Sequence, residues 1–269
     1  MHLKILSLTA CLLYLTSSLL LILRLNRTEL IEKITSPVKK ALSLAGLGSL
    51  LYAYILVQFI FVEQGIQFNF YYTIAILSWW MAGLLIFMSL FRPLENLGIL
   101  FFPIAGISVV TLSFLLVNQT AFILPWQIGV HALLSILAYS ILALAVIQAL
   151  ALAWQDQHLH NHQPNRFTSA LPPLHTMEEL LFELIRQGFI FLSFSLISGM
   201  IYLENIFAQH LAHKTLLSIM AWMIFATLIW GRWRYGWRGK SVIRSTLAGF
   251  MLLMLGYLGS KFILEVVLV

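Results

Sequence analysis

The chain has 269 residues, of which 61% are hydrophobic and only 10% are charged, and its formal net charge is +6. Its mean hydropathy is +0.92. This composition excludes a soluble globular protein and predicts an integral membrane protein, because one compact core cannot bury so much apolar surface. Cys11 is the single cysteine of the sequence, which excludes an intrachain disulfide and a thiol relay within this chain.

Apolar runs along the chain predict about eight membrane spans, since a helix needs roughly 20 such residues to cross the hydrocarbon. None of the runs alternates with a period of two, so we expect an all-α, polytopic membrane protein in which every span is a helix. In chain order the predicted spans cover residues 3–23, 41–62, 70–91, 97–117, 128–153, 189–207, 215–230 and 242–264.

The positions of lysine and arginine predict which side of the membrane each link faces. Basic residues gather in the links after the first, third, fifth and seventh spans, whereas the second and fourth links have none and the sixth has only Lys214. Because cytoplasmic loops are enriched in Lys and Arg, those four links are expected inside and both termini outside. The positive charge then reflects topology and contact with anionic lipid headgroups, and it does not indicate nucleic-acid binding.

We expect a single integral membrane domain over residues 1–269, with one long cytoplasmic loop at 154–187. Within this loop Thr176 and Glu179 have the spacing of a capping box. A helix is therefore predicted to begin there and to run into the sixth span.

The front of the same loop carries three alternating histidines, His158, His160 and His162. In an extended backbone they could bind a transition metal. No cysteine or carboxylate cluster accompanies them to complete a tetrahedral site, which favours an ordinary solvated segment.

His131 stands near the predicted outer end of the fifth span, where an imidazole usually has a function. Ser135 and Tyr139 follow at one and two helical turns, so this face of the span is polar enough to line a pocket. Two interpretations stay open on the residue types alone. His131 is either a ligand for a bound group, or a structural partner that hydrogen-bonds to a neighbouring helix.

The sixth link adds His210 and His213, spaced to lie on one side of a helical turn, with Lys214 beside them. A planar anionic ligand at this face could use a neutral imidazole as axial ligand, aromatic rings for stacking and a cation for its carboxylates. Haem fits that description.

Two stretches resemble the cytochrome c assembly, or haem-handling, family. Residues 125–139, with Trp126 and His131, are similar to the helix start "WL..H....L.Y". Residues 222–259 are similar to the tail "W..YA…R…GWRG…GF…Y.G" through Trp222, the run 236–239 and Tyr257. Residues 171–174, followed by residues 177–179, also match, and they make the chain most similar to the YpjD and HemX branch of this family. The resemblance covers residues 70–269, implies an eight-helix layout and leaves 1–69 less family-like.

The sequence also departs from this family's pattern. In its cytochrome c synthases a tryptophan-rich external segment with the WWD motif precedes the seventh helix and cradles haem, but residues 202–214 here contain neither Trp nor Asp. Lys214 alone stands where the motif has its lysine. The family's histidine near the end of the next helix is replaced around Trp230, and residues 259–261 lack the second external histidine. From that ligand set only His131 is matched.

The resemblance implies a bacterial inner-membrane, multi-pass protein that binds or presents haem at its outer face, assisting cytochrome c maturation or haem homeostasis. In this hypothesis His131 binds the haem iron, His210 or His213 supplies a second ligand, Trp126 stacks on the ring and Lys214 pairs with a propionate. Acid should weaken such a site, because a protonated imidazole does not bind iron. The implied partners are haem, an apocytochrome or other haem-maturation proteins, and membrane lipids.

Two other functions stay open. In the first, the haem site has decayed and the protein is a membrane-embedded scaffold whose contact surface is the basic, aromatic turn 232–240. The other interpretation of this turn is that it only anchors the protein at the membrane interface. A small-molecule transporter is the third class, although Glu63, Arg92 and Glu95 fall at predicted helix ends and no acid–base pair lies mid-span. No catalytic residue is predicted, since no phosphate loop, nucleophile motif or dinucleotide fingerprint occurs.

Overall fold

The computed structural model describes residues 2–25, 37–62, 65–115, 122–160, 172–202 and 209–256. Within these ranges the chain is almost entirely helical, and 7 helices are long and apolar enough to cross a membrane. This confirms the all-α, polytopic membrane class. The eighth predicted span, 242–264, overlaps a helix at Lys240–Met254.

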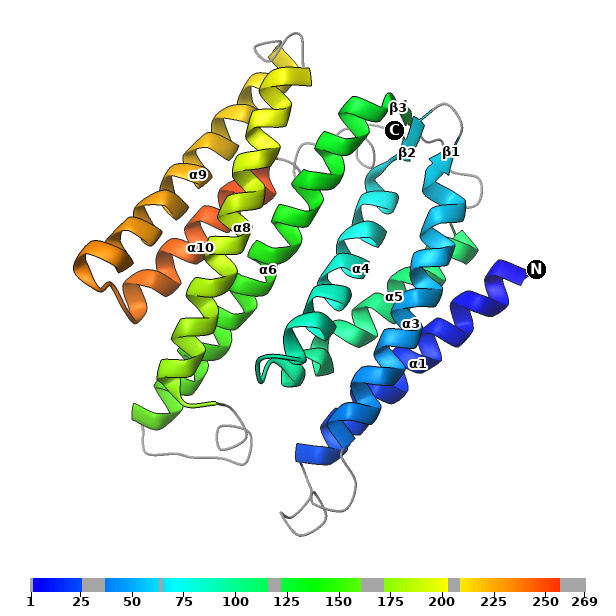
Figure 1. Ribbon diagram of the computed structural model, residues 1–269, viewed down its shortest axis with the longest axis horizontal. Coiled ribbons are helices and arrows are strands. Elements are labelled where there is room, and N and C mark those ends of the chain that lie inside the picture. Colours follow the sequence, from blue (N-terminus) through cyan, green and yellow to red (C-terminus); the bar gives the residue numbers. More distant parts are fainter. Residues whose placement is uncertain are drawn as a thin grey trace. The chain divides into compact units, whose positions relative to one another are not determined.

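Contacts divide the chain into two compact units, and the first holds residues 1–123 and 164–172. Its helix α1 packs on α3 and α5, and α4 packs on the same two helices (Figure 1). Asn69 caps α4, because its side-chain oxygen accepts a hydrogen bond of 2.7 Å from the amide of Tyr72. The elements are α1 (His2–Leu25), α3 (Pro37–Ile60), α4 (Phe70–Ser89), the 3-10 helix η1 (Glu95–Leu97) and α5 (Gly98–Leu115).

A small sheet in the order β1-β2-β3 was not indicated by the sequence. Its strands are β1 (Phe61–Val62), β2 (Gly65–Phe68) and β3 (Phe122–Leu124). β1 and β2 run antiparallel, with Phe61 opposite Ile66. Strands of 2–4 residues are too short for an alternating pattern to be recognised in a sequence.

Polar side chains join the helices of the first unit. The buried hydroxyl of Tyr52 on α3 lies 3.0 Å from the carbonyl of Ala75, 3.1 Å from Ser78 Oγ and 3.0 Å from Ser108 Oγ. Arg24 Nη1, at the end of α1, lies 2.8 Å from Glu95 Oε1 in η1. The prediction that Glu95 stands at a helix end is therefore confirmed, and its charge has a partner.

The second unit holds residues 124–163 and 173–269. Its described helices are α6 (Trp126–His160), α8 (Leu174–Tyr202), α9 (Gln209–Tyr235) and α10 (Lys240–Met254). α6 lies along α8 over most of its length and also packs on α10, while α9 packs on α8 and α10 (Figure 1). Gly188 permits the close approach of α8 to α6, since a Cβ there would lie 2.6 Å from the side chain of Leu142.

Within the expected loop at 154–187, α6 continues to His160 and α8 already begins at Leu174. The helix predicted to run from this loop into the sixth span is confirmed, but it starts at Leu174, two residues before Thr176. The carbonyl of Pro173 accepts the helical hydrogen bond of the Met177 amide at 3.1 Å, so the helix starts directly after the proline pair. Glu179 lies 3.6 Å from His175, in the first turns of the same helix.

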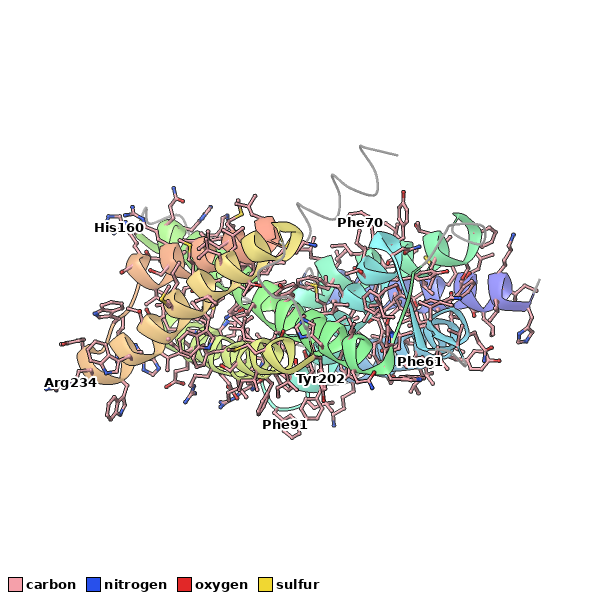
Figure 2. All side chains as sticks on the ribbon, turned by 90° about the horizontal axis from the view of Figure 1, so that it is seen from above. Phe61, Phe70, Phe91, His160, Tyr202 and Arg234 are labelled. Atoms are coloured by element: carbon pink, nitrogen blue, oxygen red, sulfur yellow. The ribbon has the colours of Figure 1, made fainter. Side chains whose placement is uncertain are left out.

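Large apolar side chains cover the outside of the helices (Figure 2). Leu12 on α1 is 60% exposed and Leu50 on α3 is 69% exposed. In water such a surface would be costly, whereas in lipid it faces hydrocarbon of the same polarity. The exposed surface therefore agrees with a protein whose helices span a bilayer.

Candidate functional site

His131 lies about one and a half turns into α6, and its half-buried ring rests against α8. Nδ1 of the ring is 2.9 Å from Ser198 Oγ. Beside it Gly199 has no side chain, and a Cβ at that position would lie 3.0 Å from Cε1 of the imidazole. The glycine therefore gives the ring room to lie directly on the backbone of α8.

Serine hydroxyls continue this contact between α6 and α8. Ser135 Oγ donates to the carbonyl of His131 at 2.8 Å and lies 2.7 Å from Ser195 Oγ. Ser198 Oγ donates to the carbonyl of Ser195 at 2.9 Å. The prediction that Ser135 shares the face of His131 is confirmed, and the hydroxyls of this face are paired inside an apolar surrounding.

Sequence reasoning missed Ser195, Ser198 and Gly199 as neighbours of His131. A signal for them existed, because two serines three residues apart lie on one face of a helix and a glycine follows them. Small and hydroxyl-bearing residues commonly mark the contact faces of membrane helices. The sequence could not say which helix that face contacts.

The hydrogen bond to Ser198 is the structural role that the sequence left open for His131. It is made at Nδ1, the backbone carbonyl of Ser195 also lies within reach of the ring, and no hydrogen bond at Nε2 is found among the residues that the structure describes. A structural role at one nitrogen and a ligand role at the other are therefore compatible in the same ring.

Several apolar side chains close in sequence to this contact are exposed. Met200 is 71% exposed and Ile201 is 69% exposed, directly after the glycine that touches the imidazole. Trp126 and Val130 on α6 are also exposed. Trp126 and His131 are about 140° apart around the helix axis. A flat ligand touching both must therefore lie across the end of α6 rather than along one face.

Lys214, His210 and His213 belong to α9, which begins after the end of α8. The carbonyl of Lys214 would lie 3.6 Å from a Cβ at Gly256, so the start of α9 adjoins the end of α10. The side chains of His210 and His213 lie outside the described residues. Their assignment as second ligand, and that of Lys214 to a propionate, therefore stay predictions.

The side chains of His158 and His160, the two described members of the other histidine group, do not point toward a common site. His158 and His160 are in the last turn of α6, where positions two apart point to nearly opposite sides. His158 Nδ1 lies 2.9 Å from the carbonyl of Trp154, and the two rings are 4.2 Å apart. His162 is outside the described residues, within which no metal-binding group of three His, Cys, Asp or Glu occurs.

The turn between α9 and α10 has a defined backbone. Gly236 and Gly239 both have a φ of 66°, which favours glycine. The amide of Gly239 donates to Glu178 Oε1 at 2.9 Å, and the guanidinium of Arg232 lies 4.7 Å from the ring centre of Phe182. Both contacts tie the turn to α8.

Other side chains of this turn point outward. Trp233 is 82% exposed, and Arg234 extends from the end of α9 (Figure 2). Tyr235, Arg238 and Lys240 are also exposed. The turn therefore combines a fixed backbone with a basic, aromatic surface.

Comparison with known proteins supports the resemblance. The family model described as cytochrome C assembly protein matches residues 47–268, and so begins earlier than residue 70. The inner membrane protein YpjD of Escherichia coli strain K12 is 36% identical over 138 residues, 51% of this chain and 52% of that protein. An uncharacterized 28.8 kDa protein of Azospirillum brasilense is 32% identical over 143 residues, 52% of this chain and 53% of that protein.

A more distant relative carries a functional name. The cytochrome c biogenesis protein CcsA of Prochlorococcus marinus strain NATL1A is 27% identical over 107 residues, 39% of this chain and 33% of that protein. The chain spans about half the length of YpjD and of the Azospirillum protein. No solved structure matches. The multi-pass helices agree with the inner-membrane localisation predicted from the sequence. Because the family model covers most of its length, the chain belongs to the cytochrome c assembly protein family.

Proposed function

We propose that this protein binds or presents haem at the predicted outer end of α6 and α8, with Nε2 of His131 as a ligand of the iron. The observation that carries the proposal is the asymmetry of the ring. Nδ1 is fixed by Ser198 at 2.9 Å, while the described residues offer Nε2 no hydrogen bond. Histidine ligands of metals are commonly held in this way, by a hydrogen bond at the other nitrogen.

The residues around the imidazole have the chemistry that haem requires. Bound haem supplies an iron centre that changes oxidation state and a macrocycle that can be handed to an apocytochrome. Val130 and Met200 are exposed apolar side chains, each next in sequence to a residue of the contact between the ring and α8, and they would offer apolar surface to a porphyrin. Trp126 would stack from the end of α6. Lys214 would meet a propionate, and His210 or His213 would be the second axial ligand.

Membership of the family supports a cellular process for this activity. One relative is named a cytochrome c biogenesis protein, and this name supports a role for the present chain in the same process. We therefore propose cytochrome c maturation or haem homeostasis as the process, with an apocytochrome or another haem-maturation protein as partner.

Haem content of the purified protein tests the proposal. After expression with supplied haem, the wild-type protein should show a Soret band, and His131→Ala should reduce the bound haem at least about tenfold. His158→Ala is the matched control, since it removes another histidine of α6, whose hydrogen bond and ring contact are both with Trp154 of the same helix. Equal haem in wild type and His131→Ala would refute the proposed ligand.

The turn 232–240 supports a second candidate, a scaffold that contacts another protein. Trp233 is 82% exposed although the turn is held by Glu178 and Phe182. Fixed, exposed aromatic residues are typical of contact surfaces. Photocrosslinking from Trp233 in membranes decides between the candidates: discrete protein adducts support a partner, and lipid adducts alone support an interfacial anchor.

A further inference from the structure

The proton on the imidazole of His131 can be placed from the hydroxyl groups around it. Each serine hydroxyl has one hydrogen to donate. Ser198 Oγ donates its hydrogen to the carbonyl of Ser195 at 2.9 Å. With that hydrogen in use, Ser198 Oγ can only accept from the ring, so the hydrogen of the 2.9 Å contact must come from Nδ1.

The neighbouring serines have no spare hydrogen for the ring. Ser135 Oγ donates to the carbonyl of His131 at 2.8 Å. Its contact of 2.7 Å with Ser195 Oγ must then use the hydrogen of Ser195. All three hydroxyl hydrogens are therefore directed to oxygen atoms, and none is left to donate to the imidazole.

The opposite arrangement makes fewer hydrogen bonds. If Ser198 donated to Nδ1, its bond to the Ser195 carbonyl would be lost, and the ring hydrogen would move to Nε2. The described residues give that N–H no acceptor. An unpaired donor in an apolar surrounding costs about 1–3 kcal/mol.

We infer that Ser198, acting with the carbonyl of Ser195, holds His131 as the Nδ1–H tautomer and leaves the lone pair on Nε2. Ser198 is thus a positioning residue that presents Nε2 for metal binding, a role that rests on the proposed function. Gly199 contributes by keeping the space that lets the ring reach the hydroxyl. Contacts with α8 therefore fix the protonated nitrogen of the ring already in the haem-free protein.

Nitrogen NMR of the protein without haem tests the tautomer directly. With ¹⁵N-labelled histidine in lipid bilayers, protonated and unprotonated ring nitrogens resonate far apart, and His131→Gln identifies the signals of this ring. We expect Nδ1 protonated and Nε2 unprotonated in the wild type. A protonated Nε2 in the neutral ring would overturn the inference, and this readout needs no variant of the serines.

Variants then test the role of the hydroxyl. Ser198→Ala should give a mixture of tautomers, and Ser198→Thr, which keeps a hydroxyl, should restore the wild-type spectrum. Ser195→Ala keeps the accepting carbonyl and should leave the tautomer unchanged. Ser140→Ala is the control, because Ser140 is a buried serine of α6 bonded to the carbonyl of Ile136. An unchanged spectrum in Ser198→Ala would refute the role of Ser198.

Haem binding gives the second readout. Ser198→Ala should weaken haem binding about tenfold and shift the midpoint potential of the iron, while Ser198→Thr should restore both. If every variant, His131→Ala included, binds haem as well as the wild type, the proposed function is refuted and the NMR result still stands. Normal tautomers in Ser198→Ala would refute the inference and leave the proposed function standing.

Discussion

The amide of Gly239 donates a hydrogen bond of 2.9 Å to the carboxylate of Glu178, which joins the turn between α9 and α10 to the first turns of α8. Gly239 has a φ of 66°, so this amide is directed by a backbone conformation that other residues rarely adopt. This carboxylate therefore helps to fix the turn that carries the exposed Trp233 and Arg234.

Removing this carboxylate should loosen the turn. Glu178→Ala leaves the Gly239 amide without its acceptor and should lower the free energy of unfolding by about 1–3 kcal/mol. Glu178→Gln keeps an accepting oxygen and should lose less. Thermal unfolding in detergent measures the change, and trypsin cleavage after Arg238 should become faster in Glu178→Ala. Glu179→Ala is the control, and equal cleavage rates in both variants would contradict the role of Glu178.

Gly188 sets the distance between α6 and α8. In Gly188→Ala the new Cβ would lie 2.6 Å from Cγ and Cδ2 of Leu142, a fully buried side chain, so the two helices must separate or the leucine must shift. We expect a loss of about 1–3 kcal/mol in the free energy of unfolding.

A matched control tests whether this loss comes from the contact. Gly46→Ala places its Cβ where nothing lies within 4 Å, so it should leave stability unchanged or raise it through helix propensity. In the double variant Leu142→Ala with Gly188→Ala, the loss should be smaller than the sum of the single losses. Strictly additive losses would show that Gly188 and Leu142 do not interact.

The hydroxyl of Tyr52 should stabilise the first unit. Tyr52→Phe removes the group that contacts Ala75, Ser78 and Ser108, and should cost about 1–2 kcal/mol of unfolding free energy. Tyr54→Phe, two residues further on the same helix, changes an exposed tyrosine and serves as control. A difference in midpoint temperature between the two variants is expected, and identical unfolding curves would argue against the network.

Much of the fold follows from apolar length in the sequence. The predicted fifth span, 128–153, lies inside α6, whose bounds are Trp126–His160. The prediction ended early because hydropathy reports the membrane-crossing part, while the helix continues through the polar residues Gln155 and Asp156. Likewise the apolar run of the sixth span begins at residue 189, whereas α8 begins at Leu174, and only the capping-box spacing at Thr176 indicated this earlier start. Hydropathy cannot detect helical turns that extend beyond the hydrocarbon.

The candidate site was predicted only in part. His131 and Ser135 could be identified because a histidine and a serine one turn apart are unusual in an apolar span. Ser195 and Ser198 could not be paired with them, since the register between α6 and α8 depends on packing at positions such as Gly188 and Gly199. The residue pattern of one helix carries no information about its register against another helix.

Chemical rescue of the missing ligand tests the central claim most directly. His131→Gly removes the imidazole that contacts Ser198 and Gly199 on α8, and free imidazole can then occupy the vacated space. We predict that purified His131→Gly has lost its haem Soret band and regains it when imidazole and haem are added together. His158→Gly should need no imidazole. Haem binding by His131→Gly that is equal with and without imidazole would contradict His131 as the ligand.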